Sequence, residues 1–384
     1  MTEPDEAFYD ERLLPLPDRE YRPDNVAQLR EIVEDSGAIE PDHALVALGG
    51  GEHLRSSAIG ERRFDVVRVD GCERIRELDR ESNTVRVEAG ASWQSLRDRL
   101  ADEGRSVHAY GLQPAEATVG GLLGRWQPAE RQLHRGDIRE GCIALRTASP
   151  AGADYNYLAA PRKASGPDHR FLYIGGEAAL GVILEATLVV QPDHPGVLMQ
   201  WEAPEIGDAV ELFRQLAHLD IRVGWSRWTR SEARYEAVFH APAGLMEEKL
   251  RRLRTKTGRE MEVERGAAVE ERCRALETDH PAARSTEGAE TIWRGVWTLS
   301  RLPDAIEALS SQLEDVVVEE WGPQHATVYL KAGEANPAWR KRREPFQAAL
   351  ADRAIVDGGE AIWPAWVQRL KAELDPEGRL AVGP

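Results

Sequence analysis

The stretch that decides the fold of this chain is ALVALGGGEHL, residues Ala44–Leu54. Its first five residues are an unbroken apolar run, which is typical of a strand buried on both faces. Three glycines, Gly49, Gly50 and Gly51, follow at once. Glycines in this position let the backbone approach a ligand closely, and their N–H groups can form an anion-binding nest. The stretch predicts a loop that holds a diphosphate or, as the alternative, a set of tight turns.

Two further glycine-rich passages lie downstream, at Ala117–Gly121 and at Ile174–Gly181. Neither passage is a P-loop, because the chain contains no GxxxxGK[ST] motif and lacks the lysine that this chemistry needs. Neither is a Rossmann fingerprint, because no GxGxxG follows a strand. Spacing alone therefore leaves ligand loops and tight turns as alternatives for all three passages.

Apolar periodicity predicts alternating helices and strands around these passages. The expected elements are a helix capped by Asp24 or Asn25 that ends at Gly37, strands at 64–69 and 84–88, a helix between Ser92 and Gly104, and a strand at 182–190. Pro192–Gly196 contains two prolines and a glycine, which stop regular structure. We therefore place a domain boundary there.

Beyond this boundary the order of the expected elements changes. They are a strand at 197–201, a helix at 209–216, strands at 221–228 and 235–240, and a helix that Pro242 opens. This β-α-β-β-α order suggests a split βαβ, ferredoxin-like domain. The order partly repeats between 293 and 330, and two amphipathic helices near 339–350 and 366–374 end the chain. The predicted parts are residues 20–192, 197–335 and 336–384.

Composition excludes several classes of protein. The net charge of −17 over 384 residues argues against a nucleic-acid partner. No apolar run approaches the roughly 18 residues of a membrane span, and the acidic N-terminus lacks the apolar segment of a secretory signal. Cys72, Cys142 and Cys273 lie too far apart to form a disulfide framework or an iron–sulfur ligand set. We expect a cytoplasmic protein without a metal site.

The residues of the glycine-rich passages resemble the FAD-binding segments of the p-cresol methylhydroxylase and vanillyl-alcohol oxidase (PCMH-type) family. ALGGGEHL resembles the pyrophosphate loop of that family, GLQPAEATVGGLL at Gly111–Leu123 the second FAD segment, and FLYIGGE at Phe171–Glu177 the third. LDPEGRL at Leu374–Leu380 resembles the tail that closes the fold, and within the family the match is best to the glycolate oxidase subunits that bind FAD. The resemblance implies an α+β fold: a two-lobed FAD-binding domain, a ferredoxin-like cap, and C-terminal helices that close on the FAD domain.

The resemblance also implies which residues hold FAD. Backbone amides of Gly49, Gly50 and Gly51 would hold the pyrophosphate, in the same loop as His53. The other implied contacts are Pro114, Ala117, Thr118, Gly120 and Gly121 along the dinucleotide and the flavin edge, and Gly175, Gly176, Glu177 and Val182 closing over the cofactor. Relatives that attach FAD covalently have a histidine directly after the last glycine, whereas Glu52 intervenes here. We therefore expect non-covalent FAD, and no catalytic residue can be assigned.

The implied reaction removes a hydride from a small 2-hydroxy acid such as glycolate. Because this chain has no cysteine set for onward electron transfer, the implied partners are a second flavin subunit and an iron–sulfur subunit. Two departures from the family pattern support an alternative. Trp126 stands where the family has small residues along the flavin, and Ala178 stands where it has glycine. The alternative is a non-catalytic assembly subunit with a degenerate flavin site, and a stand-alone oxidase is the third hypothesis.

Overall fold

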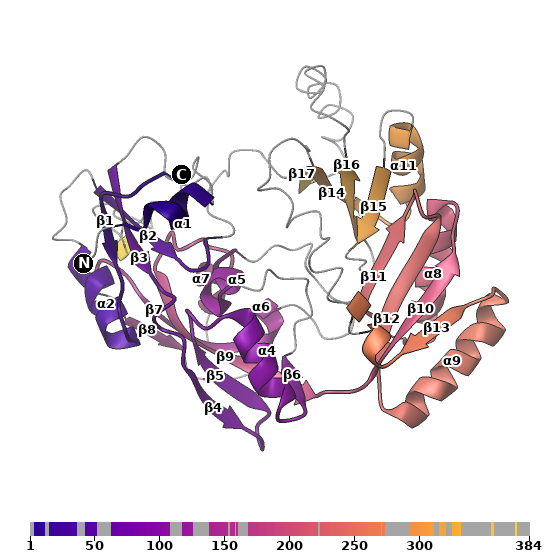
Figure 1. Cartoon of the computed structure of the whole chain (residues 1–384), viewed down its shortest axis with the longest axis horizontal. Helices are drawn as coiled ribbons and strands as arrows, with labels where there is room; N and C mark the ends of the chain where they lie inside the picture. The colour runs from indigo at the N-terminus through magenta and orange to yellow at the C-terminus, as the bar shows by residue number, and fades with distance from the viewer. Residues whose placement is uncertain are drawn as a thin grey trace.

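The computed structural model shows a mixed helix-and-sheet molecule with two lobes, which meet near Pro192–Gly196 (Figure 1). The structure describes residues 4–11, 15–36, 43–51, 63–107, 117–125, 138–152, 154–157, 159, 168–221, 223–269, 271–272, 292–310, 315–319, 325–331, 355–356 and 373–374. Every structural statement below concerns these residues.

The first lobe begins with a three-stranded parallel sheet. Its strand order is β1 (Arg19–Tyr21), β3 (Arg63–Arg68) and β2 (His43–Leu48). One face is covered by α2 (Val26–Asp35) and the other by α1 (Glu6–Glu11). Both faces of β2 are thus buried, as its unbroken apolar run predicts.

Two local interactions hold these helices in place. Asn25 is the N-cap of α2, and its side chain accepts hydrogen bonds from the N–H groups of Ala27 and Gln28. Capping of this kind satisfies N–H groups that have no partner within the helix. On α1 the buried Tyr9 hydroxyl donates to Glu20 Oε2 at 2.6 Å. The sequence predicted α2 and its cap, whereas α1, which lies before the predicted start of the domain, carried no recognised signal.

An antiparallel sheet completes the first lobe. In spatial order its strands are β4 (Ile75–Asp79), β5 (Thr84–Glu88), β9 (Val182–Pro192), β7 (Cys142–Ala148) and β8 (Asp154–Tyr157), and β6 (Arg105–Val107) also pairs with β9. The helices of this part are α4 (Trp93–Ala101), α5 (Val119–Arg125), α6 (Ile138–Gly141) and α7 (Arg170–Tyr173). Val85 and Val87 of β5 pack beneath α4 and α5 in one buried cluster.

The second lobe contains one eight-stranded sheet with a ferredoxin-like strand order. The first unit is β10 (Gly196–Glu202), α8 (Ile206–His218), β11 (Val223–Thr229), β12 (Arg234–His240), α9 (Ala243–Thr257) and β13 (Glu262–Arg265). Its strands lie in the order β13-β10-β12-β11. The first strand in the chain, β10, thus lies between the fourth, β13, and the third, β12. This is the split βαβ arrangement that the element order predicted.

The partial repeat proves to be a second unit of the same kind. It consists of β14 (Ile292–Thr298), α11 (Leu302–Ser310), β15 (Asp315–Glu319), β16 (His325–Lys331) and β17 (Ile355–Val356). Its strand order β15-β16-β14-β17 mirrors that of the first unit, and antiparallel pairing of β11 with β15 joins the two. Two half-sheets therefore form one continuous sheet, whose core includes Trp228, Phe213 and Val318.

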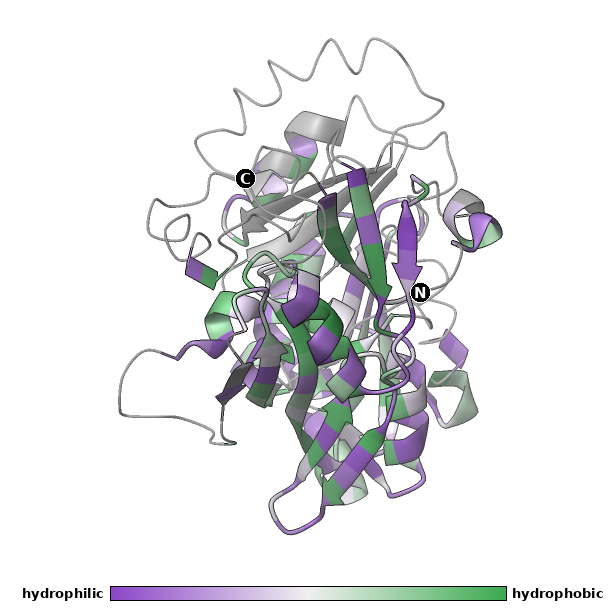
Figure 2. Cartoon of the chain, turned by 90° about the vertical axis from the view of Figure 1, so that its left-hand side faces the viewer, coloured by the Kyte–Doolittle hydropathy of each residue, from purple (hydrophilic) through white to green (hydrophobic). Residues whose placement is uncertain are grey.

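Hydropathy follows this layered arrangement. Figure 2 shows strands banded alternately hydrophilic and hydrophobic, as expected where one face packs on a core and the other does not. No helix among the described residues is long and apolar enough to cross a membrane. The two predicted C-terminal amphipathic helices lie outside the described residues, except for Glu373 and Leu374, which are helical. The residue boundaries of the three parts and the cytoplasmic location remain predictions.

Candidate functional site

The short helix α5 is the point at which the three glycine-rich passages meet. At its N-terminus Gly49 lies directly against Thr118, because a Cβ on Gly49 would overlap the Thr118 hydroxyl and lie 3.0 Å from the methyl carbon. The Thr118 Oγ1 accepts a hydrogen bond from the Gly121 N–H at 3.2 Å. The first and second passages are therefore in contact, although they lie far apart in the chain.

The third passage is attached to the opposite end of α5. The Gly175 N–H donates to the Leu123 carbonyl at 2.8 Å, and the Glu177 N–H donates to the Gly124 carbonyl at 2.9 Å. Carbonyls in the last turn of a helix have no partner within it, so these bonds satisfy them. They also set the position of the third passage relative to the second.

The second passage is fastened to the end of β5. The Gly120 N–H donates to the Ala89 carbonyl at 2.7 Å, and the Val119 N–H donates to the Ala91 carbonyl at 2.9 Å. A Cβ on Gly120 would lie 2.8 Å from the Ala89 Cβ, so only glycine allows this approach. Sequence reasoning missed the role of residues 89–91, for which the only signal is the small-residue run AGA.

Backbone strain is concentrated in the third passage. Glu177 and Ala178 both have positive φ, 46° and 64°, next to Gly175 at 81°. Non-glycine residues in this region cost about 1–3 kcal/mol each and persist where the surroundings hold them. The family pattern has glycine at position 178, and the observed φ shows why: the backbone there is left-handed. Ala178 adopts the same conformation at some energetic cost.

The structure thus brings most of the sequence-predicted cofactor residues together around α5. They are Gly49, Gly50, Gly51, Ala117, Thr118, Gly120, Gly121, Gly175, Gly176 and Glu177. The Val182 side chain belongs instead to the core beneath α2. His53, Pro114 and Trp126 lie outside the described residues. Three backbone segments rich in glycine are thus held at one helix, and residues without a Cβ allow the close backbone approach that an extended dinucleotide requires.

The second lobe presents a buried polar row on the sheet face opposite α8, α9 and α11, which is the face turned toward the first lobe (Figure 1). Gln200 Nε2 donates to Glu236 Oε1 at 2.6 Å, and Arg272 forms an ion pair with the other Glu236 oxygen at 2.7 Å. Arg227, paired with Glu236 across the strands, lies over the Trp225 ring at 5.5 Å. Buried charges of this kind require partners, and they also provide groups that can bind a charged ligand.

The cysteines described by the structure do not supply a nucleophile. Burial raises the pKa of the Cys142 thiol to about 12, and burial followed by the nearby Glu88 charge does the same for Cys72. Neither thiol forms thiolate at neutral pH. No group of three or more possible metal ligands occurs among the residues that the structure describes.

Gly49→Ala is expected to weaken FAD binding about tenfold or more, because the added methyl overlaps Thr118 and displaces the first loop from the second. Quenching of flavin fluorescence during titration of the FAD-free protein measures the affinity. Gly207→Ala, where a Cβ meets no atom within 4 Å, is the control and should leave the affinity unchanged. Equal FAD affinities of the two variants would show that the Gly49–Thr118 contact does not contribute to FAD binding.

Comparisons with known proteins agree with this geometry. A family model described as an FAD binding domain matches residues 17–153. Alkyldihydroxyacetonephosphate synthase of Caenorhabditis elegans is 28% identical over 212 residues, which are 53% of this chain and 34% of that protein. Cytochrome-type D-lactate dehydrogenase 1 of Saccharomyces cerevisiae is 28% identical over 38% of this chain and 25% of its own length. D-2-hydroxyglutarate dehydrogenase of Xanthomonas citri is 24% identical over a match that covers 44% of this chain and 36% of that protein.

The matched region therefore spans between a quarter and about a third of the length of these curated relatives. A solved structure of alkyldihydroxyacetonephosphate synthase superposes with a TM-score of 0.76 at 14% identity, covering 97% of this chain and 77% of that one. At this identity the superposition shows a shared fold.

Proposed function

We propose that this chain, which carries an FAD-binding domain of the p-cresol methylhydroxylase type with homologues among the FAD-linked oxidoreductases, oxidises a small 2-hydroxy acid. The observation that carries the proposal is the convergence of the three glycine-rich passages on α5, with the first passage against Thr118 and the third hydrogen-bonded to Leu123 and Gly124.

The residues around α5 would hold the cofactor. We assign the pyrophosphate to the backbone N–H groups of Gly49–Gly51, and the flavin end to Gly120, Gly121 and the third passage. Bound FAD would accept the hydride, which carries both electrons of the oxidation. The protein's own contribution is to position the cofactor, to exclude water and to orient the substrate.

The polar row of the second lobe is the proposed substrate side of the site. Arg227 is the residue we assign to the substrate carboxylate, because a guanidinium forms paired hydrogen bonds with a carboxylate and this one lies over the Trp225 ring. A 2-hydroxy acid is favoured because the relatives include enzymes named for D-lactate and D-2-hydroxyglutarate. A glycolate-like substrate, and electron transfer to a second flavin subunit and an iron–sulfur subunit, form the most specific version of the proposal.

A non-catalytic assembly subunit is the second candidate. It is favoured by Trp126 and by Ala178, which adopts a left-handed backbone at a position where the family has glycine. In this candidate the fold serves to contact partner subunits, and flavin is not retained.

The absorption spectrum of the purified protein separates the two candidates. We expect flavin bands near one FAD per chain, released into the supernatant on acid denaturation and bleached anaerobically by glycolate, D-lactate or D-2-hydroxyglutarate. A colourless protein that takes up no added FAD would contradict flavin binding and support the assembly subunit. Bands that stay with the pellet would indicate covalent attachment, with His53 as the first residue to replace.

A further inference from the structure

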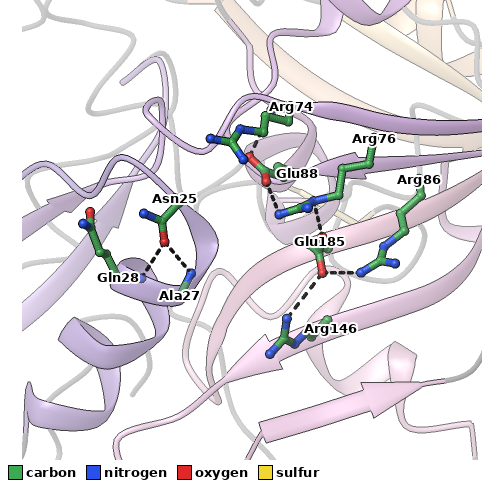
Figure 3. A network of polar contacts seen from close by, with 9 residues as sticks. All are labelled: Asn25, Ala27, Gln28, Arg74, Arg76, Arg86, Glu88, Arg146 and Glu185. Atoms are coloured by element: carbon green, nitrogen blue, oxygen red, sulfur yellow. Dashed lines mark hydrogen bonds and ion pairs between the residues drawn. The ribbon is translucent and has the colours of Figure 1, made fainter.

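A hollow in the first lobe lies between α2 and the antiparallel sheet, at the N-terminal end of that helix. It has a volume of about 440 Å³, and its walls include Asn25, Arg30, Glu34, Arg74, Arg76 and Arg146. Figure 3 shows Asn25 and the three arginines of the sheet side. This volume lies within the range of small-molecule sites. Four arginines line the hollow, although the chain as a whole has a net charge of −17.

Two buried carboxylates hold the arginine wall in a defined shape. Arg76 contacts both: its Nη2 lies 2.5 Å from Glu88 Oε1 and its Nε lies 2.7 Å from Glu185 Oε1. Glu185 Oε2 also pairs with Arg86 at 2.9 Å and with Arg146 at 3.5 Å. The Glu88 and Glu185 side chains are 1% and 4% exposed. The guanidinium groups are therefore positioned before any ligand arrives, which reduces the entropy lost on binding.

Arg74 differs from its neighbours. Its backbone N–H donates to Glu88 Oε2 at 3.0 Å, while its exposed guanidinium makes no hydrogen bond or ion pair with any described residue. It stands at the hollow with its charge uncompensated by a direct partner. A guanidinium in this state is available for a phosphate or carboxylate group, which it binds through paired hydrogen bonds.

The opposite wall adds to the positive potential. Asn25 caps α2 there, so the positive end of the helix dipole points toward the hollow. Arg30 is paired with Glu34 at 2.6 Å. The lining contains four arginines and two carboxylates, Glu31 and Glu34. Glu88 and Glu185, which pair with these arginines, and Arg86, which shares Glu185, lie outside the lining.

This hollow is separate from the cofactor residues. Side chains alternate along a strand, so Arg86 and Glu88 point away from Val85 and Val87, which pack beneath α4 and α5. The arginine wall thus occupies the sheet face opposite α5, around which the glycine-rich passages gather. A ligand here would not compete with FAD.

We propose that this hollow, the arginine pocket, binds a small organic anion that carries two or more phosphate or carboxylate groups. Arg74, Arg76 and Arg146 would bind the anionic groups from the sheet side, and Arg30 with the N-terminal turn of α2 from the helix side. The pocket is a binding site and not a catalytic one.

Calorimetric titration of the FAD-saturated full-length chain with pyrophosphate and with citrate tests the proposal. We expect saturable binding of at least one probe at low ionic strength, weakened about tenfold by Arg74→Ala, because a charge-assisted hydrogen bond contributes on this scale. Binding of pyrophosphate alone assigns phosphate groups to the ligand, and binding of citrate alone assigns carboxylate groups. Arg254→Ala is the matched control, because Arg254 is also exposed and its side chain makes no hydrogen bond or ion pair among the described residues.

Failure to bind either probe, or equal affinities in the two variants, would overturn the proposal. Because Arg74 is exposed and has no side-chain partner among the described residues, its replacement should leave the melting temperature unchanged, so a loss of binding cannot be attributed to unfolding. The comparison of Arg74→Ala with Arg254→Ala can also be made without FAD. Failure of the arginine pocket is thereby distinguishable from failure of flavin binding.

Discussion

Gly90→Ala is expected to destabilise the first lobe by about 3 kcal/mol or more and to abolish retention of FAD. A Cβ on Gly90 would overlap the Val69 carbonyl oxygen and lie 2.8 Å from the Cys72 carbonyl oxygen. Both obstacles are backbone atoms, which cannot move aside as the end of a flexible side chain does. Gly90 also donates its N–H to Cys72 O at 2.9 Å, so any displacement costs that hydrogen bond.

The effect on FAD follows from the position of Gly90 between two supports of α5. Ala89 and Ala91, its chain neighbours, accept the hydrogen bonds that place Gly120 and Val119. Moving residue 90 therefore moves the second glycine-rich passage. Urea unfolding followed by circular dichroism measures the stability, and the flavin-to-protein absorbance ratio measures retention. Gly207→Ala is the control and should change neither quantity. A Gly90→Ala protein as stable as the wild type would show that Gly90 does not lie this close to the carbonyl groups of Val69 and Cys72.

Glu185→Ala is expected to lower the free energy of unfolding by about 2–3 kcal/mol. The carboxylate is buried and pairs with Arg76, Arg86 and Arg146. Its removal leaves three like charges close together on one sheet face. The three guanidinium groups are between 29% and 49% exposed and can regain some hydration, so the loss is smaller than for a wholly buried pair.

Chemical denaturation at two salt concentrations measures this effect. Added salt should reduce the difference between Glu185→Ala and the wild type, because it screens the repulsion among the arginines. Glu232→Ala, which removes an exposed carboxylate from the turn between β11 and β12, is the control and should change stability by no more than about 0.5 kcal/mol. A loss as small as the control's would mean that the Glu185 network contributes little to holding the sheet together.

Local patterns predicted many of the elements correctly. The Asn25 cap, the buried strand β2 and the Ser92 cap of α4 each depend on residues within one or two turns of the chain. The ferredoxin-like order of the second lobe was also predicted, because amphipathic helices and alternating strands carry their period in the sequence. The short elements α1 and β8 were missed, since a few residues carry too little periodicity to be recognised.

The candidate site was likewise predicted only in part from the sequence. The glycine-rich passages and their resemblance to FAD-binding segments were readable from the sequence, because a close backbone approach demands residues without a Cβ. Which passage touches which was not readable. The contact of Gly49 with Thr118, the hydrogen bonds from the third passage to the last turn of α5, and the buried Gln200–Glu236–Arg227 row join positions far apart in the chain.

The arginine pocket is the feature that the sequence alone predicted least. Arg74, Arg76, Arg86 and Arg146 occur in the sequence as isolated charges, with no motif that distinguishes them from a solvated surface. Strand pairing of β4 with β5, and of β5 and β7 with β9, gathers them around Glu88 and Glu185, and α2 closes the other side. The sequence by itself determined the elements and the glycine-rich loops, because these depend on local periodicity and backbone freedom. Only the tertiary structure decided which charges share a site, because strand register brings together residues that no sequence spacing relates.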